Sequence, residues 1–254
     1  MTGNMTDLTS FKAGGYQFIP GVFQYSAGVR AGDGFEIVRA RFRETLPMSQ
    51  AFPAIEAHLR ARHRSPDSFC ACELRSPAPF SEDGFKAFNS EYVGWLERWN
   101  LVKEGVNPVA RTNVCPQVAP PRTVGVYAFS YTVPRTTAAP GGFVVAGSGE
   151  APEGKGNYRD HAIRRGDRSV EGLAEKARWV LGEMERRMRA LDATWADTTG
   201  THLYTVYDIH PLLEREIVGR GASRMGLSWH YARPPVEDLD YEMDARGVST
   251  EIVI

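Results

Sequence analysis

The sequence has few cysteines, no excess of charge of either sign and no long hydrophobic run. Only 3 of its 254 residues are cysteines, and a small odd number is typical of a reducing compartment. The 30 basic residues are balanced by 31 acidic ones, which argues against nucleic-acid binding through bulk positive charge. The longest apolar runs, such as residues 142–147, are too short to cross a bilayer. We therefore expect neither a nucleic acid nor a membrane as a partner.

The N-terminal segment lacks the features of an export signal. Residues 1–12 are polar, with no basic start and no apolar stretch behind it. Together with the cysteine count, this predicts a cytoplasmic protein.

The sequence also lacks a recognisable metal-ligand pattern. The 6 histidines are scattered, and no pair of them stands at helical or strand spacing beside a carboxylate in a way that suggests a zinc site. Cys70 and Cys72 form a Cys-x-Cys pair, but Cys115 is the only other thiol. Residues two apart in a strand share a face, and a free cysteine packs as a small hydrophobe. We expect a buried pair on one face of a strand, no metal and no cofactor.

What the sequence does contain is enough apolar residues, 42% in all, to build a core. The clearest helix is predicted over residues 170–191, where apolar residues recur at helical spacing behind Ser169, a suitable N-cap. The same spacing predicts helices over 51–62 and around 85–99, and Pro211 opens a short one over 211–217. Strands rich in β-branched and aromatic residues are predicted over 36–42, 69–74, 123–131, 142–146, 201–207 and 240–248.

This order of elements is similar in the two halves of the chain. Corresponding features recur with a period of roughly 115 to 120 residues, which suggests two tandem domains. Residues 134–142 are rich in Pro, Thr, Ala and Gly and are typical of a linker. We therefore predict an N-terminal domain over 1–133, a linker over 134–142 and a C-terminal domain over 143–254.

Four short motifs in these halves resemble the RidA (YjgF) family of reactive-intermediate deaminases. Residues 107–114, Asn-Pro-Val-Ala-Arg-Thr-Asn-Val, resemble the Pro-Ala-Arg-(Ser/Thr)-x-Val segment of the family, and residues 221–227 stand in the equivalent place of the second half. Residues 239–245 resemble the Glu-Ile-Glu-Ala strand, and residues 143–149 resemble the Val-Ser-Gly-Gln segment. The matches extend from about residue 14 to the C-terminus, and their order and spacing carry most of the weight.

The resemblance implies an α/β (α+β) fold of two tandem RidA-like, chorismate-mutase-like domains, each a mixed β-sheet packed against two helices. It also implies an enzyme that hydrolyses an imine or enamine carboxylic acid to a ketone and ammonia. In the family an arginine holds the substrate carboxylate, a role that suits the planar, bidentate guanidinium. Arg111 and Arg224 match that arginine and Glu242 matches a glutamate that positions or deprotonates water. Asn113, His230 and Tyr231 are assigned to substrate binding.

The sequence departs from the family pattern in both halves. In the first half the position matching the glutamate falls at or near Gly125, so that half has an arginine and no evident acid. In the second half the acid is present, but the arginine segment lacks the proline and is followed by the polar-aromatic residues 228–231. One composite site, two different sites, or one active and one structural half all fit this pattern.

Two other functions fit the same residues. One is a chorismatase-like hydrolase or lyase acting on a cyclic carboxylate, and the other is a protein that binds a small acid without turnover. Because sites of the family lie between adjacent subunits, the resemblance also implies a homotrimer. In every case the expected partner is a small carboxylate-bearing molecule.

Overall fold

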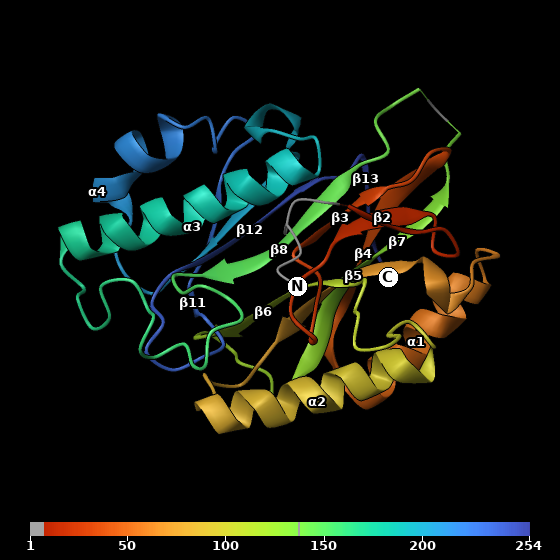
Figure 1. The fold of residues 1–254 in the computed structure, drawn as a ribbon, viewed down its shortest axis with the longest axis horizontal. Helices are drawn as coiled ribbons and strands as arrows, with labels where there is room; N and C mark the ends of the chain where they lie inside the picture. The colour runs from red at the N-terminus through yellow and green to blue at the C-terminus, as the bar shows by residue number, and fades with distance from the viewer. Residues whose placement is uncertain (1–7, 137) are drawn as a thin grey trace.

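The computed structural model of the chain describes residues 8–136 and 138–254 and is built in four layers. Figure 1 shows helices on the two outer faces, with the strands between them. Residues 1–7 of the segment inspected for an export signal, and residue 137 of the predicted linker, lie outside the described residues.

One layer is a seven-stranded sheet with the order β1-β2-β3-β8-β12-β9-β10. All its neighbours are antiparallel except β9 and β10, which are parallel. Its outer face is covered by α3 (Val170–Ala190), α4 (His210–Leu212) and the π-helical turn η3 (Leu213–Val218). The strands are β1 (Thr9–Phe11), β2 (Tyr16–Ile19), β3 (Gly28–Ala31), β8 (Phe143–Gly149), β9 (Gly200–Tyr204), β10 (Ser228–His230) and β12 (Glu242–Gly247).

The second layer of strands is a six-stranded sheet with the order β11-β6-β5-β7-β4-β13. It is mixed, because β5 and β6 are parallel, as are β4 and β13. Helices α1 (Met48–Arg60) and α2 (Glu82–Arg98) cover its outer face. The strands are β4 (Phe35–Pro47), β5 (Phe69–Arg75), β6 (Ala110–Pro116), β7 (Gly125–Pro134), β11 (Ala232–Arg233) and β13 (Thr250–Val253), and two 3-10 turns complete the fold, η1 (Pro66–Ser68) and η2 (Trp195–Asp197).

The helices form where the apolar spacing predicts them. Helix α3 begins at Ser169, whose hydroxyl accepts a hydrogen bond from the backbone N–H of Gly172 at 3.1 Å, as expected for an N-cap. Its apolar stripe is buried against the seven-stranded sheet, and α1 and α2 bury theirs against the six-stranded sheet. A smaller cluster of side chains from both sheets fills the space between them. The predicted α+β fold of mixed sheets packed against helices is confirmed.

The two sheets do not follow the two halves of the chain. Strands β1 to β3 come from the N-terminal end, yet β3 pairs with β8, so they extend the sheet that holds the second-half strands. Conversely, β11 pairs with β6 and the C-terminal β13 pairs with β4 of the first half. Division into domains at 134–142 stays a prediction, and hydrogen bonding crosses it in both directions.

The Cys-x-Cys pair is buried as predicted, but the prediction that it shares one face is wrong. Cys70 packs in the cluster between the sheets, whereas Cys72 packs in the core beneath α1 and α2. The register of β5 against β7 shifts between Phe69 and Ala71. A residue inserted by such a bulge reverses the alternation of faces that follows it, and this separates the two thiols.

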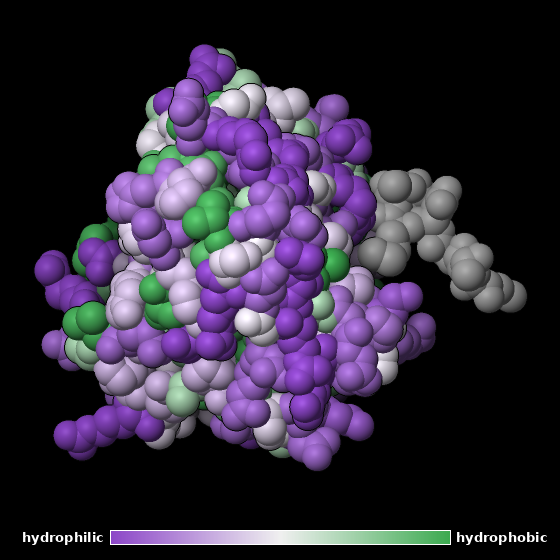
Figure 2. Space-filling model, turned by 90° about the vertical axis from the view of Figure 1, so that its left-hand side faces the viewer, coloured by the Kyte–Doolittle hydropathy of each residue, from purple (hydrophilic) through white to green (hydrophobic). Residues whose placement is uncertain are grey.

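The surface viewed from the side of α4 and β11 is mostly hydrophilic, with small separate hydrophobic patches (Figure 2). Within the described residues, no helix combines the length and the apolar character needed to cross a membrane.

Candidate active site

The most unusual charged side chain in the fold is Arg111 on β6, because it is buried without a counter-ion. It is only 3% exposed, and within the described residues no carboxylate oxygen lies within 4.0 Å of its guanidinium. Its Nη1 donates to Oδ1 of Asn89 at 2.7 Å, and the aromatic rings of Tyr25 and Tyr92 lie 4.8 and 5.1 Å from its Cζ. A buried cation is costly unless paired, so this arrangement calls for an anionic ligand.

Glu242, at the start of β12, opens into the same cavity as Arg111. Its residue is 4% exposed, and no hydrogen bond or ion pair reaches its carboxyl from the described residues. Burial raises the pKa of Glu242 well above its usual value, and the charge of Asp244 raises it further, while Arg111 lowers it. Burial therefore favours the protonated, neutral form of the Glu242 carboxyl group. Gly147 on β8 leaves it room, because a Cβ there would overlap a Glu242 carboxyl oxygen.

We call the space lined by Arg111 and Glu242 the inner cavity. Asn113 stands two residues after Arg111 on β6 and also lines it. The side-chain oxygen of Asn113 accepts from the Ser76 hydroxyl at 2.9 Å, whereas its Nδ2 is buried without a partner. Such an orphaned donor is uncommon in a native protein. The remaining walls come from the loop between β2 and β3, strand β8, α2, the loop after β8 and the loop before β12. Their residues are Tyr25, Gly147, Gly149, Phe85, Tyr158, Pro235, Val236 and Leu239.

A second space, which we call the outer pocket, adjoins the inner cavity. The two share a wall made by Phe85 of α2 and Tyr158 of the loop after β8. The inner cavity has a volume of about 40 Å³ and the outer pocket about 360 Å³. Asn89, the partner of Arg111, lines the outer pocket. Arg111 therefore lines the inner cavity, and its hydrogen-bond partner lines the outer pocket.

The loop after β8 is tied down by a buried arginine of α3. Arg187 is 1% exposed and pairs with Glu153 at 2.8 Å, and its Nη1 donates to the backbone carbonyl of Ala146 at 3.1 Å. Glu153 also accepts from the Tyr25 hydroxyl at 2.7 Å. These contacts join β8, α3 and the tyrosine that stacks on Arg111, so they define one wall of the inner cavity.

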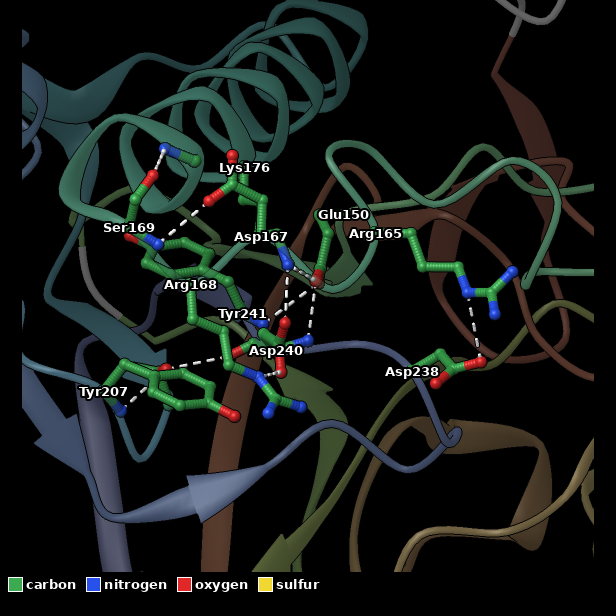
Figure 3. A network of polar contacts seen from close by, with 12 residues as sticks. Glu150, Arg165, Asp167, Arg168, Ser169, Lys176, Tyr207, Asp238, Asp240 and Tyr241 are labelled. Atoms are coloured by element: carbon green, nitrogen blue, oxygen red, sulfur yellow. Dashed lines mark hydrogen bonds and ion pairs between the residues drawn. The ribbon is translucent and has the colours of Figure 1, made fainter.

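A polar network holds the end of β8 and the start of β12 together (Figure 3). Lys176 of α3, fully buried, donates to Asp240 at 2.5 Å and lies 3.4 Å from Glu150. Glu150 in turn accepts the backbone N–H groups of Asp240 and Tyr241 at 2.6 and 3.0 Å. Glu242 directly follows Tyr241 in the chain. The network therefore fixes the point at which the carboxyl group of Glu242 enters the cavity.

A family model described as 2-aminomuconate deaminase CnbZ matches residues 8–252. The chain belongs to this deaminase family. A curated relative from Comamonas testosteroni, a 2-amino-5-chloromuconate deaminase, is 52% identical over 251 residues, which cover 98% of this chain and 100% of that protein. Membership of the family supports the predicted deaminase function.

Solved structures resemble this family member more distantly. A chorismatase aligns with a TM-score of 0.50 at 13% identity, over 90% of this chain and 79% of its own, which is a likeness of fold alone. The YjgF gene product of E. coli aligns with a TM-score of 0.31 at 18% identity, over 42% of this chain and 80% of its own. The tandem RidA-like interpretation therefore stays a prediction.

The structure brings together three of the six predicted site residues and leaves three apart. Arg111, Asn113 and Glu242 line the inner cavity, whereas Arg224 lies exposed on the turn before β10. Tyr231 is 56% exposed. His230 packs in a different cluster, where its Nε2 lies 2.8 Å from Nδ1 of His202. Burial and, after it, the charge of His202 lower the pKa of His230 to about 4.

Sequence reasoning missed the aromatic and polar residues that complete the cavity of this deaminase. Tyr25, Asn89, Tyr158 and the pair formed by Arg187 and Glu153 carry no motif of their own. A buried-looking arginine within the apolar stripe of α3 was the one available signal, because a charge on such a stripe needs a partner. No group of three or more His, Cys, Asp or Glu side chains in residues 8–136 and 138–254 is arranged to hold a metal ion.

Proposed function

We propose that this protein hydrolyses the C–N bond of a 2-aminomuconate-type enamine or imine carboxylic acid and releases ammonia. The family model and the curated relative support the substrate class through their names. The observation that carries the chemistry is the inner cavity, in which a buried guanidinium without an ion pair and a buried carboxyl group with a raised pKa line one space.

Arg111 binds the substrate carboxylate next to the carbon that bears nitrogen. Its Nη1 is engaged with Asn89, and the other guanidinium donors remain for the ligand. The incoming anion offsets the cost of the buried charge. The unpartnered Nδ2 of Asn113 supplies another donor from the same strand. Together they orient the substrate, and orientation lowers the barrier by removing freedom that the reactants would otherwise lose.

Glu242 supplies and recovers the proton. The neutral carboxyl group donates its proton to a carbon of the enamine, which becomes a protonated imine (iminium). The resulting carboxylate then takes a proton from a water molecule as that water adds to the C=N carbon. The carbinolamine collapses to a ketone and ammonia, and the C–N bond is broken. Over the cycle one water molecule is consumed and one ammonia is released, so Glu242 returns to its neutral form.

The test is ammonia release from 2-aminomuconate generated in situ, followed with purified protein. We expect Glu242→Gln to lower kcat by roughly 10²–10⁴-fold, the usual contribution of a general acid or base. Arg111→Lys should raise KM, because an ammonium cannot reproduce the fork of a guanidinium. Arg224→Gln is the matched control, and its activity should equal that of the unmodified protein.

Thermal unfolding of each variant separates lost chemistry from lost structure. A protein that shows no rate above buffer, or an Arg224→Gln variant that is inactive while Arg111→Lys is active, would overturn the proposal. Neither alternative function has comparable support, since the likeness to a chorismatase is one of fold and fold does not fix function.

A further inference from the structure

The inner cavity is too small for the whole of a linear dicarboxylic acid. Its volume of about 40 Å³ accommodates a few water molecules, or the reacting end of a substrate. The adjoining outer pocket offers about 360 Å³. A substrate whose first carboxylate lies on Arg111 must therefore extend past Phe85 and Tyr158 into the outer pocket.

The outer pocket is lined by two lysines that form no ion pair with the described residues. Lys86 of α2 and Lys155 of the loop after β8 line it from opposite elements. No carboxylate oxygen of the described residues lies within 4.0 Å of either ammonium group. Two lysines that line one pocket without an ion pair favour an anionic ligand, because opposite charges attract over several ångströms even near water.

Two acidic residues also line the outer pocket, and one of them is already engaged. Glu82 accepts the backbone N–H groups of Tyr158 and Arg159 at 2.7 and 3.1 Å through Oε1. Its charge therefore stabilises the loop that forms the wall. Asp83 is exposed in the first turn of α2, a position that suits a carboxylate because of the helix dipole. The four formal charges of the pocket thus balance, but the carboxylate of Glu82 is engaged with backbone N–H groups and that of Asp83 is exposed at the surface.

Asn89 adds a directed donor at the junction of the two spaces. It is 2% exposed, and its Oδ1 must face Arg111, because a guanidinium can only donate. The Nδ2 group is therefore turned away from the arginine, and no acceptor among the described residues bonds to it. An amide donor without a partner on the wall of a pocket is a binding group for an acceptor.

We propose that the outer pocket is a second carboxylate subsite, in which Lys86, Lys155 and Asn89 hold the distal carboxylate of a dicarboxylic substrate. The inference rests on the proposed function for the placement of the first carboxylate on Arg111. It makes the enzyme selective for substrates with an acid group at each end. A monocarboxylate of the same length keeps only the Arg111 contacts.

The test compares two ligands with the same carbon skeleton, trans,trans-muconate with two carboxylates and sorbate with one, by isothermal titration calorimetry. We expect the unmodified protein to bind muconate at least tenfold more tightly than sorbate. The double variant Lys86→Met/Lys155→Met should lose that preference while its affinity for sorbate stays within twofold. The control Lys12→Met/Lys103→Met removes the same charge from exposed positions outside the pocket and should keep the preference.

Each result has a defined meaning. Equal affinity of the unmodified protein for both ligands, or a muconate preference retained by Lys86→Met/Lys155→Met, overturns the subsite. Loss of the preference in the Lys12→Met/Lys103→Met control also overturns it, because the effect would then be one of net charge. Failure of the proposed function is seen separately, as absence of ammonia release by the unmodified protein, since the binding test needs no turnover.

Discussion

At the scale of single residues, the site depends on charges that burial leaves unbalanced. Arg111 has no counter-ion among the described residues, and burial together with the charge of Asp244 raises the pKa of Glu242. In water an arginine and a glutamate would both be ionised and solvated. The protein removes that solvent, so the arginine attracts an anion and the glutamate holds a proton to donate.

Asp244 controls the proton of Glu242 from two residues along β12. Four charged groups act on that proton, Asp244 and Glu150 raising the pKa and Arg111 and Arg187 lowering it. If the neutral form of Glu242 is the active one, kcat falls as pH rises through its pKa. Asp244→Asn removes a charge that raises this pKa, so the alkaline limb of the kcat–pH profile should move to lower pH.

The hydrogen bond from the Tyr204 hydroxyl to Asp244, 2.8 Å long, can be accepted equally by the amide oxygen of asparagine. The fold should therefore tolerate Asp244→Asn. Asp208→Asn, at an exposed carboxylate outside the cavity, is the control and should leave the limb in place. An Asp244→Asn limb that stays or moves to higher pH would contradict the assignment of the proton to Glu242.

At the scale of elements, the position of β12, which carries Glu242, depends on the buried network of Lys176, Glu150 and Asp240 (Figure 3). Helix α3 supplies the lysine, the segment after β8 supplies the glutamate, and the segment before β12 supplies the aspartate. Burial raises the pKa of Glu150 to about 7, although Lys176 and the backbone N–H groups of Asp240 and Tyr241 lower it. One buried group of charges thus connects α3, the segment after β8 and the segment before β12.

Removing the lysine from this network leaves the buried Glu150 without a cation and leaves Asp240 with only Arg168, whose side chain is 56% exposed. We expect Lys176→Met to lower the free energy of unfolding by about 3–5 kcal/mol, as is usual when one partner of a buried pair is deleted. Arg60→Met, which breaks the exposed pair of Arg60 and Glu56 on α1, should cost less than about 1 kcal/mol. Urea denaturation measures both, and similar losses in the two variants would show that the network contributes no more than a surface pair.

At the scale of the whole molecule, the halves of the chain complete each other. The cavity takes Arg111 from the first half and Glu242 from the second, so a single chain holds both groups. Of the arrangements that the sequence left open, the geometry corresponds to a composite site. The homotrimer implied by the family resemblance stays a proposal, but these two groups do not need a second chain to meet.

The exchange of strands predicts that neither half folds alone. A fragment of residues 1–135 holds β1 to β3 without β8, and a fragment of residues 136–254 holds β13 without β4. Each would also expose the apolar cluster that fills the space between the sheets. We expect each fragment to lack a cooperative thermal transition by circular dichroism and the mixture to regain one together with muconate binding. A cooperative transition in either fragment alone would indicate an independent domain.

The local pattern of the sequence alone predicted most of the secondary structure. Of the six site residues that it predicted, three line the inner cavity. The helical spacing after Ser169 predicted α3 to within a residue, because the apolar residues of an amphipathic helix recur every three to four positions along the sequence. The family motifs pointed to Arg111, Asn113 and Glu242, and the cavity contains all three. The motifs also predict Arg224, and the polar-aromatic residues that follow it predict His230 and Tyr231, but the structure places all three outside the cavity.

Tertiary structure alone decided which of these residues meet. Arg111 and Glu242 belong to different sheets and are joined only by the packing of one sheet on the other, which depends on side chains spread over the whole chain. The bulge that separates Cys70 from Cys72, and the pairing of β13 with β4, likewise arise from contacts between distant segments. Sequence patterns record the period of an element and the chemistry of its side chains. Burial, which makes an arginine bind and a glutamate hold its proton, is a property of the folded molecule.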